Sequence, residues 1–329
     1  MERVDVTIIG GGPVGLFAAF YAGMRGMSAR ILDSLPELGG QLTALYPEKF
    51  VFDMPGFPKV LARDLAIAMA EQGTEFEPHV ILEETASELV SEPDGYAIVT
   101  SKGARCPTRT VLISAGAGAF TPTRLGVPRE EEYEGKGLYY GVREKEVFRK
   151  KDVVLVGGGD SAFDWCLNLL PVAKSLTMVH RRDAFRAMED SVRKVREACV
   201  PMKLWTVVSE LHGDGRLEAV TLENRQSQEK ERVALDALIV NIGFKSSLGP
   251  MLDWGLEIER NQIRVNPTTC ETNLPGVYAV GDVCAYEGKL KLIATGVGEA
   301  VTAICYAKTR IDPDAKLFPG HSSDMDLGL

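Results

Sequence analysis

The sequence predicts an α/β protein with two Rossmann-like dinucleotide-binding domains, the second inserted into the first. An apolar strand at residues 4–9 runs into a glycine-rich turn, and a second apolar strand at 153–156 does the same. The segment after the second unit is too short for a third such fold, yet it holds one more apolar strand, at 276–280. Because that strand suits the first sheet, we expect one domain to be split around the other.

The first unit follows the strand–turn–helix pattern and then changes character. Short stretches of alternating apolar and polar residues predict an antiparallel meander inserted into a doubly wound sheet. In chain order we expect a strand at 4–9, a helix at 13–24, a strand at 29–32, a helix at 60–72, strands near 79–82, 86–91 and 96–101, and a strand at 110–114 that enters a small-residue turn at 115–118.

The first turn carries Gly10, Gly12, Pro13 and Gly15. Such a turn lets backbone N–H groups and a helix N-terminus meet a pyrophosphate without side-chain obstruction. The next strand ends in Asp33, whose carboxylate can accept hydrogen bonds from an unphosphorylated adenosine ribose. These residues predict the first dinucleotide site.

The second unit repeats the plan. We expect strands at 153–156, 175–179, 202–208, 217–223 and 235–240, with helices at 161–170 and 191–198. The last strand enters a turn at 241–244 that resembles the one at 115–118. The predicted domains are therefore 1–116 with 247–329, and 117–246.

The second turn is followed by basic residues where the first is followed by an acid. Two guanidinium groups suit a 2′-phosphate, as Asp33 suits a free ribose, so this site should take NADPH. The predicted NADPH residues are Gly157, Gly159, Asp160, Ser161, His180, Arg181 and Arg182.

Three further segments are candidates for the first site, and each has a structural alternative. Gly40 and Gln41 can approach a heterocycle, or they form an ordinary surface turn. Asp282 follows an apolar strand and can accept from a ribityl hydroxyl, cap a helix, or do both. Thr295 lies where the last long helix opens, so that the positive end of the helix dipole faces a ring that gains negative charge, or the segment only packs.

Composition limits the remaining functions. The chain has 329 residues and a net charge of −9, which argues against nucleic acid as a partner. It has no apolar run long enough for a membrane span and no signal-peptide pattern, so we expect a cytoplasmic protein. The cysteines form no C-x-x-C pair or zinc-like cluster, so no metal site is expected, and the sequence has no G-x-S-x-G hydrolase motif.

Taken together, these motifs resemble the low-molecular-weight thioredoxin reductases. The resemblance spans nearly the whole chain, from the first turn to the strand that ends in Asp282. Those reductases carry a C-x-x-C redox pair shortly before the second glycine turn, whereas residues 138–143 here read Leu-Tyr-Tyr-Gly-Val-Arg. Electrons therefore cannot reach a protein dithiol by the usual route.

The sequence is more similar to a branch without the disulfide, the thioredoxin-reductase-like ferredoxin–NADP⁺ reductases. Shared features lie at 40–49, 160–162 and 286–289 and in a tail with His321. The resemblance implies FAD and NADPH as cofactors, ferredoxin or flavodoxin as the electron carrier, and a homodimer. It also implies that Tyr46 stacks on one flavin face and that His321 covers the other, often from the partner subunit.

Two alternatives stay open, namely an NADPH-dependent reductase of low-molecular-weight disulfides and a non-catalytic flavin or NADP(H) sensor. The first is disfavoured because Pro13 and Val14 stand where related disulfide reductases have a cysteine. If an acidic ferredoxin docks, the docking face must be locally positive. The candidate docking residues are Arg143, Lys145, Arg149, Lys150, Lys151, Lys289 and Lys291.

Overall fold

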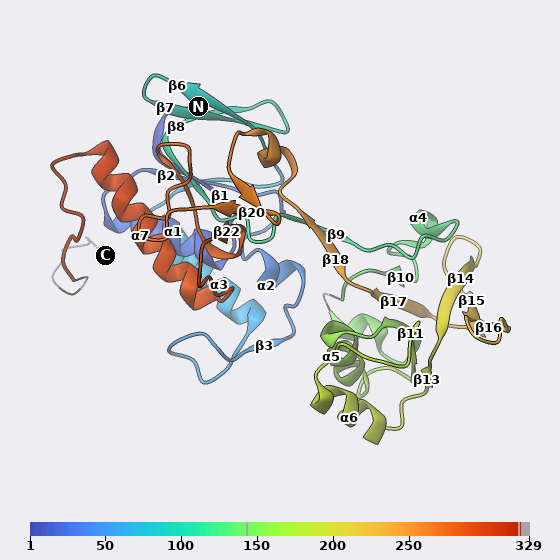
Figure 1. Cartoon of the computed structure of the whole chain (residues 1–329). Helices are drawn as coiled ribbons and strands as arrows, with labels where there is room; N and C mark the ends of the chain where they lie inside the picture. The colour runs from blue at the N-terminus through green and yellow to red at the C-terminus, as the bar shows by residue number, and fades with distance from the viewer. Residues whose placement is uncertain (143, 322, 324–329) are drawn as a thin grey trace. The chain divides into compact units, whose positions relative to one another are not determined.

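A computed structural model describes residues 1–142, 144–321 and 323 (Figure 1). The chain forms two compact units. Unit 1 comprises Met1–Phe120 with Ser246–Leu329, and unit 2 comprises Thr121–Lys245. The strands β9 (Ala119–Pro122) and β18 (Phe244–Ser247), where the chain passes between the units, pair with each other.

Unit 1 is built on a mixed sheet in the order β5-β2-β1-β8-β7-β6. Its strands are β1 (Val4–Ile9), β2 (Ala29–Leu32), β5 (His79–Ile81), β6 (Ala86–Glu92), β7 (Gly95–Thr100) and β8 (Arg105–Ile113). Strands β5, β2, β1 and β8 are parallel, and β6 and β7 continue the sheet as an antiparallel meander. The late strand β21 (Val277–Ala279) pairs in parallel with β8 and so joins the first sheet, the sheet to which the sequence analysis assigned it.

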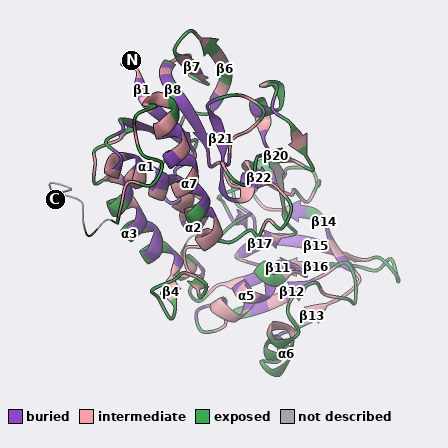
Figure 2. Ribbon diagram, turned by 60° about the vertical axis from the view of Figure 1, so that its left-hand side comes forward, coloured by how far each residue is buried: buried purple, intermediate pink, exposed green. Residues whose placement is uncertain are grey.

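Helices cover one face of this sheet: α1 (Pro13–Met24), α3 (Ala62–Thr74) and α7 (Ile293–Ile311). Figures 1 and 2 show these helices side by side, with buried residues along their contacts. Helix α1 brings small residues such as Ala18 and Ala22 to this core, so its neighbours can approach closely, and Leu16 is fully buried there. Burial of a leucine side chain stabilises a fold by about 1.5–3 kcal/mol.

The other face of the sheet is covered by shorter elements. They are η2 (Gly249–Asp253), β19 (Ile258–Glu259), β20 (Gln262–Arg264), η3 (Gly281–Val283) and β22 (Cys284–Ala285). The segment between β2 and α3 contains α2 (Gln41–Ala44) and the hairpin of β3 (Phe50–Val51) and β4 (Val60–Leu61). A core of apolar residues that includes Ile113 and Val283 fills the space between the sheet and the shorter elements that cover this face.

Unit 2 has a parallel sheet in the order β10-β17-β11-β12-β13 and an antiparallel sheet β14-β15-β16. The strands are β10 (Leu138–Tyr139), β11 (Asp152–Gly157), β12 (Ser175–Val179), β13 (Met202–Lys203), β14 (Thr206–His212), β15 (Ala219–Asn224), β16 (Lys230–Ala234) and β17 (Ala237–Asn241). The helices are α4 (Glu130–Tyr133), η1 (Lys145–Phe148), α5 (Asp160–Leu169) and α6 (Glu189–Glu197).

Several elements differ from the sequence expectations, and two of the differences have a clear physical reason. The strand expected at 202–208 is two strands in different sheets, because Trp205 has a φ of 56°, a left-handed conformation that no regular strand accommodates. Strand β16 was not predicted because its charged residues hide any alternation. Within the described residues, no helix combines the length and apolarity needed to cross a bilayer.

Candidate functional site

The first glycine turn is sterically closed to side chains. Gly10 has a φ of +108°, and a Cβ there would lie 2.6 Å from the carbonyl oxygen of Ser114. A Cβ on Gly15 would lie 1.9 Å from the carbonyl oxygen of Gly10. Gly12 precedes α1, and no side chain of the described residues caps that helix. The first N–H groups of α1 are therefore available to an anion.

Asp33 joins the end of β2 to this turn. Its Oδ2 accepts the N–H of Gly11 at 2.5 Å, and its Oδ1 accepts the N–H of Leu35 at 2.8 Å. Burial raises the pKa of the Asp33 carboxyl above its ordinary value, although these backbone donors lower it. Each oxygen keeps a second lone pair that can accept from a hydroxyl.

The turn at Gly40 lies directly against the first glycine turn. A Cβ on Gly40 would lie 2.8 Å from the Cα of Gly12, and the N–H of Gly39 donates to the carbonyl of Gly11 at 2.8 Å. The amide Nε2 of Gln41 lies 3.0 Å from the position of a Cβ on Gly116. Gly40 therefore packs on the first glycine turn, and the binding role of Gly40 and Gln41 stays a prediction.

Tyr46, Asp282 and Thr295 come from distant parts of the sequence. Burial raises the pKa of the Tyr46 hydroxyl, and the nearby Asp282 carboxylate adds to that rise. A Cβ on Gly296 would lie 2.5 Å from Val14 and 3.2 Å from the Cα of Gly281, so the first turn of α7, with Thr295, meets the start of α1. Leu292 precedes α7 and no described side chain caps it, so Asp282 does not act as its cap.

His321 lies in the C-terminal segment and is exposed. Its ring packs edge-on against Phe318, with 5.5 Å between ring centroids. Arg25, at the end of α1, holds this segment by donating to the carbonyls of Lys316 and Leu317 at 2.7 and 2.9 Å. The role of His321 at a flavin stays a prediction.

The second glycine turn is closed in the same way. A Cβ on Gly157 would lie 2.4 Å from the carbonyl oxygen of Asn241, and one on Gly158 would lie 2.2 Å from the His180 ring. A Cβ on Gly159 would meet no described atom within 4 Å. The open side of this turn is therefore at Gly159, directly before α5, where Asp160 and Ser161 begin the helix.

The segment after β12 folds back onto this turn. The N–H of Arg186 donates to the carbonyl of Gly158 at 2.8 Å, and the N–H of Met188 donates to Oδ1 of Asp160 at 2.8 Å. His180 Nε2 lies 3.2 Å from the carbonyl of Ala184, and burial lowers the pKa of that imidazole. The Asp160 side chain therefore ties the segment after β12 to the start of α5.

The arginines of this segment are exposed. Arg181 and Arg182 are free of ion pairs among the described residues, which leaves their guanidinium groups available to a phosphate. The fold adds Arg186, which the sequence analysis missed, since its backbone is tied to Gly158. The signal that could have found it is a third arginine within the same short loop.

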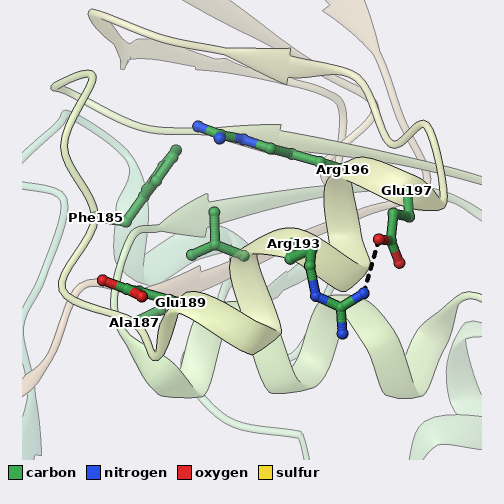
Figure 3. Close-up of a pocket in the computed structure, with 7 residues that line it drawn as sticks. Phe185, Ala187, Glu189, Arg193, Arg196 and Glu197 are labelled. Atoms are coloured by element: carbon green, nitrogen blue, oxygen red, sulfur yellow. Dashed lines mark hydrogen bonds and ion pairs between the residues drawn. The ribbon is translucent and has the colours of Figure 1, made fainter.

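A pocket of about 370 Å³ lies between this segment and α6 (Figure 3). Arg196 lies over the ring of Phe185 with its Cζ 6.0 Å from the centroid, and Arg193 pairs with Glu197 at 2.7 Å. The lining residues are Phe185, Ala187, Glu189, Val192, Arg193, Arg196 and Glu197. None of the predicted site residues lines this pocket, so the glycine turns and not this cavity define the candidate site.

Asn241 is a second residue that the sequence analysis did not assign. It ends β17 and pairs in register with Gly157, at the carboxyl edge of the parallel sheet. Its Nδ2 is buried and has no hydrogen-bond partner within the part of the chain that the structure describes. A buried donor without a partner is costly, so this amide fits a site that a dinucleotide completes.

The structure leaves some of the predicted docking residues exposed and buries the side chain of another. Lys289 is wrong as a docking residue, because its side chain is only 6% exposed and forms an ion pair with Glu299. Lys291 is exposed and stays a candidate. Arg149 is exposed but pairs with Glu146. Arg143 lies outside the described residues.

The fold and the two turns define an oxidoreductase that holds two dinucleotides. In agreement, a family model described as pyridine nucleotide-disulphide oxidoreductase matches residues 4–303. A ferredoxin–NADP reductase 2 of Shouchella clausii is 51% identical over 98% of both chains. A ferredoxin–NADP reductase of Geobacillus kaustophilus is 51% identical over 98% of this chain and 97% of its own. This chain belongs to the ferredoxin–NADP reductases of that larger family, which confirms the resemblance inferred from the motifs.

Solved structures support the fold. The crystal structure of T. acidophilum thioredoxin reductase covers 94% of this chain and 99% of its own, with a TM-score of 0.78 and 27% identity. The thioredoxin reductase of Lactococcus lactis gives the same coverage, with a TM-score of 0.77 and 27% identity. The predicted class, with two Rossmann-like domains, is thereby confirmed.

Proposed function

We propose that this protein is an FAD-dependent enzyme that transfers electrons between NADPH and ferredoxin or flavodoxin. The observation that carries the proposal is the pair of glycine turns with different partners, Asp33 at the first and Arg181 with Arg182 at the second. The near full-length identity with relatives named ferredoxin–NADP reductase supports the same function.

FAD binds to the domain formed by residues 1–116 and 247–329. The first glycine turn, which has no room for side chains at Gly10 and Gly15, and the uncapped start of α1 fit its pyrophosphate. Asp33 fits its ribose. Tyr46, which is close to Asp282, stacks on the ring. The residues that hold FAD are Gly10, Gly12, Pro13, Gly15, Asp33, Gly40, Gln41, Tyr46, Asp282 and Thr295.

NADPH binds to the domain of residues 117–246. Gly159 leaves room for a pyrophosphate at the start of α5, and the arginines follow the end of β12, where a dinucleotide-binding fold would hold the 2′-phosphate. The residues that hold it are Gly157, Gly159, Asp160, Ser161, His180, Arg181 and Arg182. Arg186 and the unpaired amide of Asn241 add to them.

When bound, FAD accepts two electrons as a hydride and passes them on one at a time. The protein supplies no acid or base; its residues bind, orient and exclude water. The N–H groups in the first turn of α7 would face the ring and stabilise the negative charge it gains, and Tyr46 would cover one of its faces. The chain acts as a homodimer in which His321 covers the other face, from its own or the partner subunit.

The cysteines argue against a disulfide reductase. Five of the six are buried, and only Cys199 is exposed. Burial raises the pKa of Cys166 and of Cys270 to about 12, so neither forms the thiolate that attacks a disulfide. The sensor alternative requires the same two folds and no electron acceptor.

The test is a titration of the FAD-bound protein with ferredoxins while NADPH oxidation is followed, with ferricyanide as an acceptor that needs no docking. We expect saturable, NADPH-dependent reduction of ferredoxin. Reduction of neither acceptor favours the sensor. If ferredoxin is not reduced but a low-molecular-weight disulfide offered in its place is, the disulfide reductase is favoured.

A further inference from the structure

We propose that Lys289 and Glu299 form a positioning pair whose opposite charges balance beside the bound flavin and so keep its reduction potential from shifting in either direction. The inference rests on the proposed FAD site. Glu299 lies in α7 and Lys289 lies in the loop after β22, and their side chains are 8% and 6% exposed. Two opposite charges this deeply buried require good geometry and further hydrogen bonds to offset their desolvation.

Besides the ammonium of Lys289, Glu299 accepts hydrogen bonds from a backbone N–H, a tyrosine hydroxyl and a thiol. Its Oε2 accepts the N–H of Gly281 at 2.7 Å, and its Oε1 accepts the Tyr286 hydroxyl at 2.6 Å and the ammonium of Lys289. The Sγ of Cys284 lies 3.6 Å from Oε2. One carboxylate therefore joins η3, the loop after β22 and α7.

This junction lies next to the residues proposed to face the flavin. Gly281 directly precedes Asp282, and the Asp282 carboxylate is near enough to Tyr46 to raise the pKa of its hydroxyl. Gly296, one turn before Glu299, packs on Gly281. The pair thus fixes both Asp282 and the first turn of α7.

As a pair, the two charges nearly cancel. If one partner is removed, the other is left as a net charge in a buried region, where salt screens a charge much less than it does at the surface. Reduction adds negative charge to the flavin, so a lone carboxylate disfavours reduction and a lone ammonium favours it. The N–H of Gly281 and the hydroxyl of Tyr286 can still donate to the Glu299 carboxylate when Lys289 is absent.

The experiment measures the midpoint potential of FAD in the full-length holoenzyme by dye-coupled reduction. We expect Lys289→Met to lower the potential and Glu299→Gln to raise it. The double variant should return close to the wild-type value. Lys291→Met removes the same charge from an exposed neighbour, where water screens it, and should leave the potential unchanged.

The opposite signs separate this role from a structural one. Disruption of packing would shift both single variants in the same direction and would not be reversed in the double variant. If Lys289→Met does not retain FAD, Lys289→Gln makes the same comparison. Shifts of one sign, or none, in FAD-bound variants overturn the inference, whereas a wild-type protein that binds no FAD contradicts the proposed function itself.

Discussion

The N–H of Gly11 donates to Oδ2 of Asp33 at 2.5 Å, so the carboxylate at the end of β2 holds the glycine turn at the end of β1. The same carboxylate accepts from Leu35 through its other oxygen. Asp33 therefore fixes the turn before any ribose is bound, and its remaining lone pairs point to a second role in binding.

FAD affinity should depend on pH through Asp33. Ribose hydroxyls donate to the ionised carboxylate, and burial raises the pKa of Asp33, so protonation weakens binding as pH falls through that raised value. The measurement is the dissociation constant of FAD from the apoprotein, followed by flavin fluorescence from neutral pH downward. Asp33→Asn should bind FAD weakly with little pH dependence; the same pH profile in both proteins would assign the titration to another group.

Arg181→Ala with Arg182→Ala should raise the KM for NADPH. Charge-assisted hydrogen bonds contribute roughly 1.5–3 kcal/mol each, so loss of both arginines should cost at least about tenfold. NADH lacks the 2′-phosphate and serves as the control, because its kinetics should change little. Unchanged NADPH kinetics in the double variant would refute the assignment of these arginines.

Replacement of all six cysteines by serine or alanine should leave NADPH-to-ferricyanide activity largely intact wherever the variant folds. In the native protein, a thiol reagent should modify Cys199 alone, because the other five are buried. Mass spectrometry of the modified protein locates the label. Loss of activity in a folded, FAD-bound variant such as Cys284→Ser would show that a thiol takes part.

The glycine motifs predicted more of the candidate site than the hydrophobic periodicity did. Glycine spacing and the residues after each second strand identified the two turns, because that chemistry is local in sequence. That β21 joins the first sheet was also predictable, since little chain remained for another sheet, but its pairing with β8 was not.

Contacts set by distant segments were not predictable. Nothing near Lys289 marks it as buried; Glu299 takes it out of solvent through the packing of α7 on η3. The same holds for Asn241, whose unpaired amide becomes visible only when β17 lies beside Gly157. The break at Trp205 depends on a backbone conformation that hydrophobic patterns do not encode.

Ferredoxin docking should depend on Lys291 and not on Lys289. Lys291→Glu should raise the KM for ferredoxin and flatten its salt dependence, because ferredoxins are acidic and Lys291 is exposed. Ferricyanide needs no docking, so its reduction should change much less. Equal losses with both acceptors would place Lys291 in flavin binding or folding instead.

Gly157 and Gly159 should respond differently to the same substitution. A Cβ on Gly157 would lie 2.4 Å from the carbonyl oxygen of Asn241, which belongs to the neighbouring strand and cannot move away cheaply. Gly157→Ala should therefore lower the Tm and weaken NADP⁺ binding together. A Cβ on Gly159 would meet no described atom within 4 Å, and its φ of −106° suits alanine, so Gly159→Ala should keep the wild-type Tm. It should still weaken NADP⁺ binding, because the new methyl group occupies the space where the pyrophosphate approaches α5. Thermal unfolding and calorimetric titration with NADP⁺ separate the two effects. Wild-type NADP⁺ affinity in Gly159→Ala would show that the pyrophosphate does not bind at this turn.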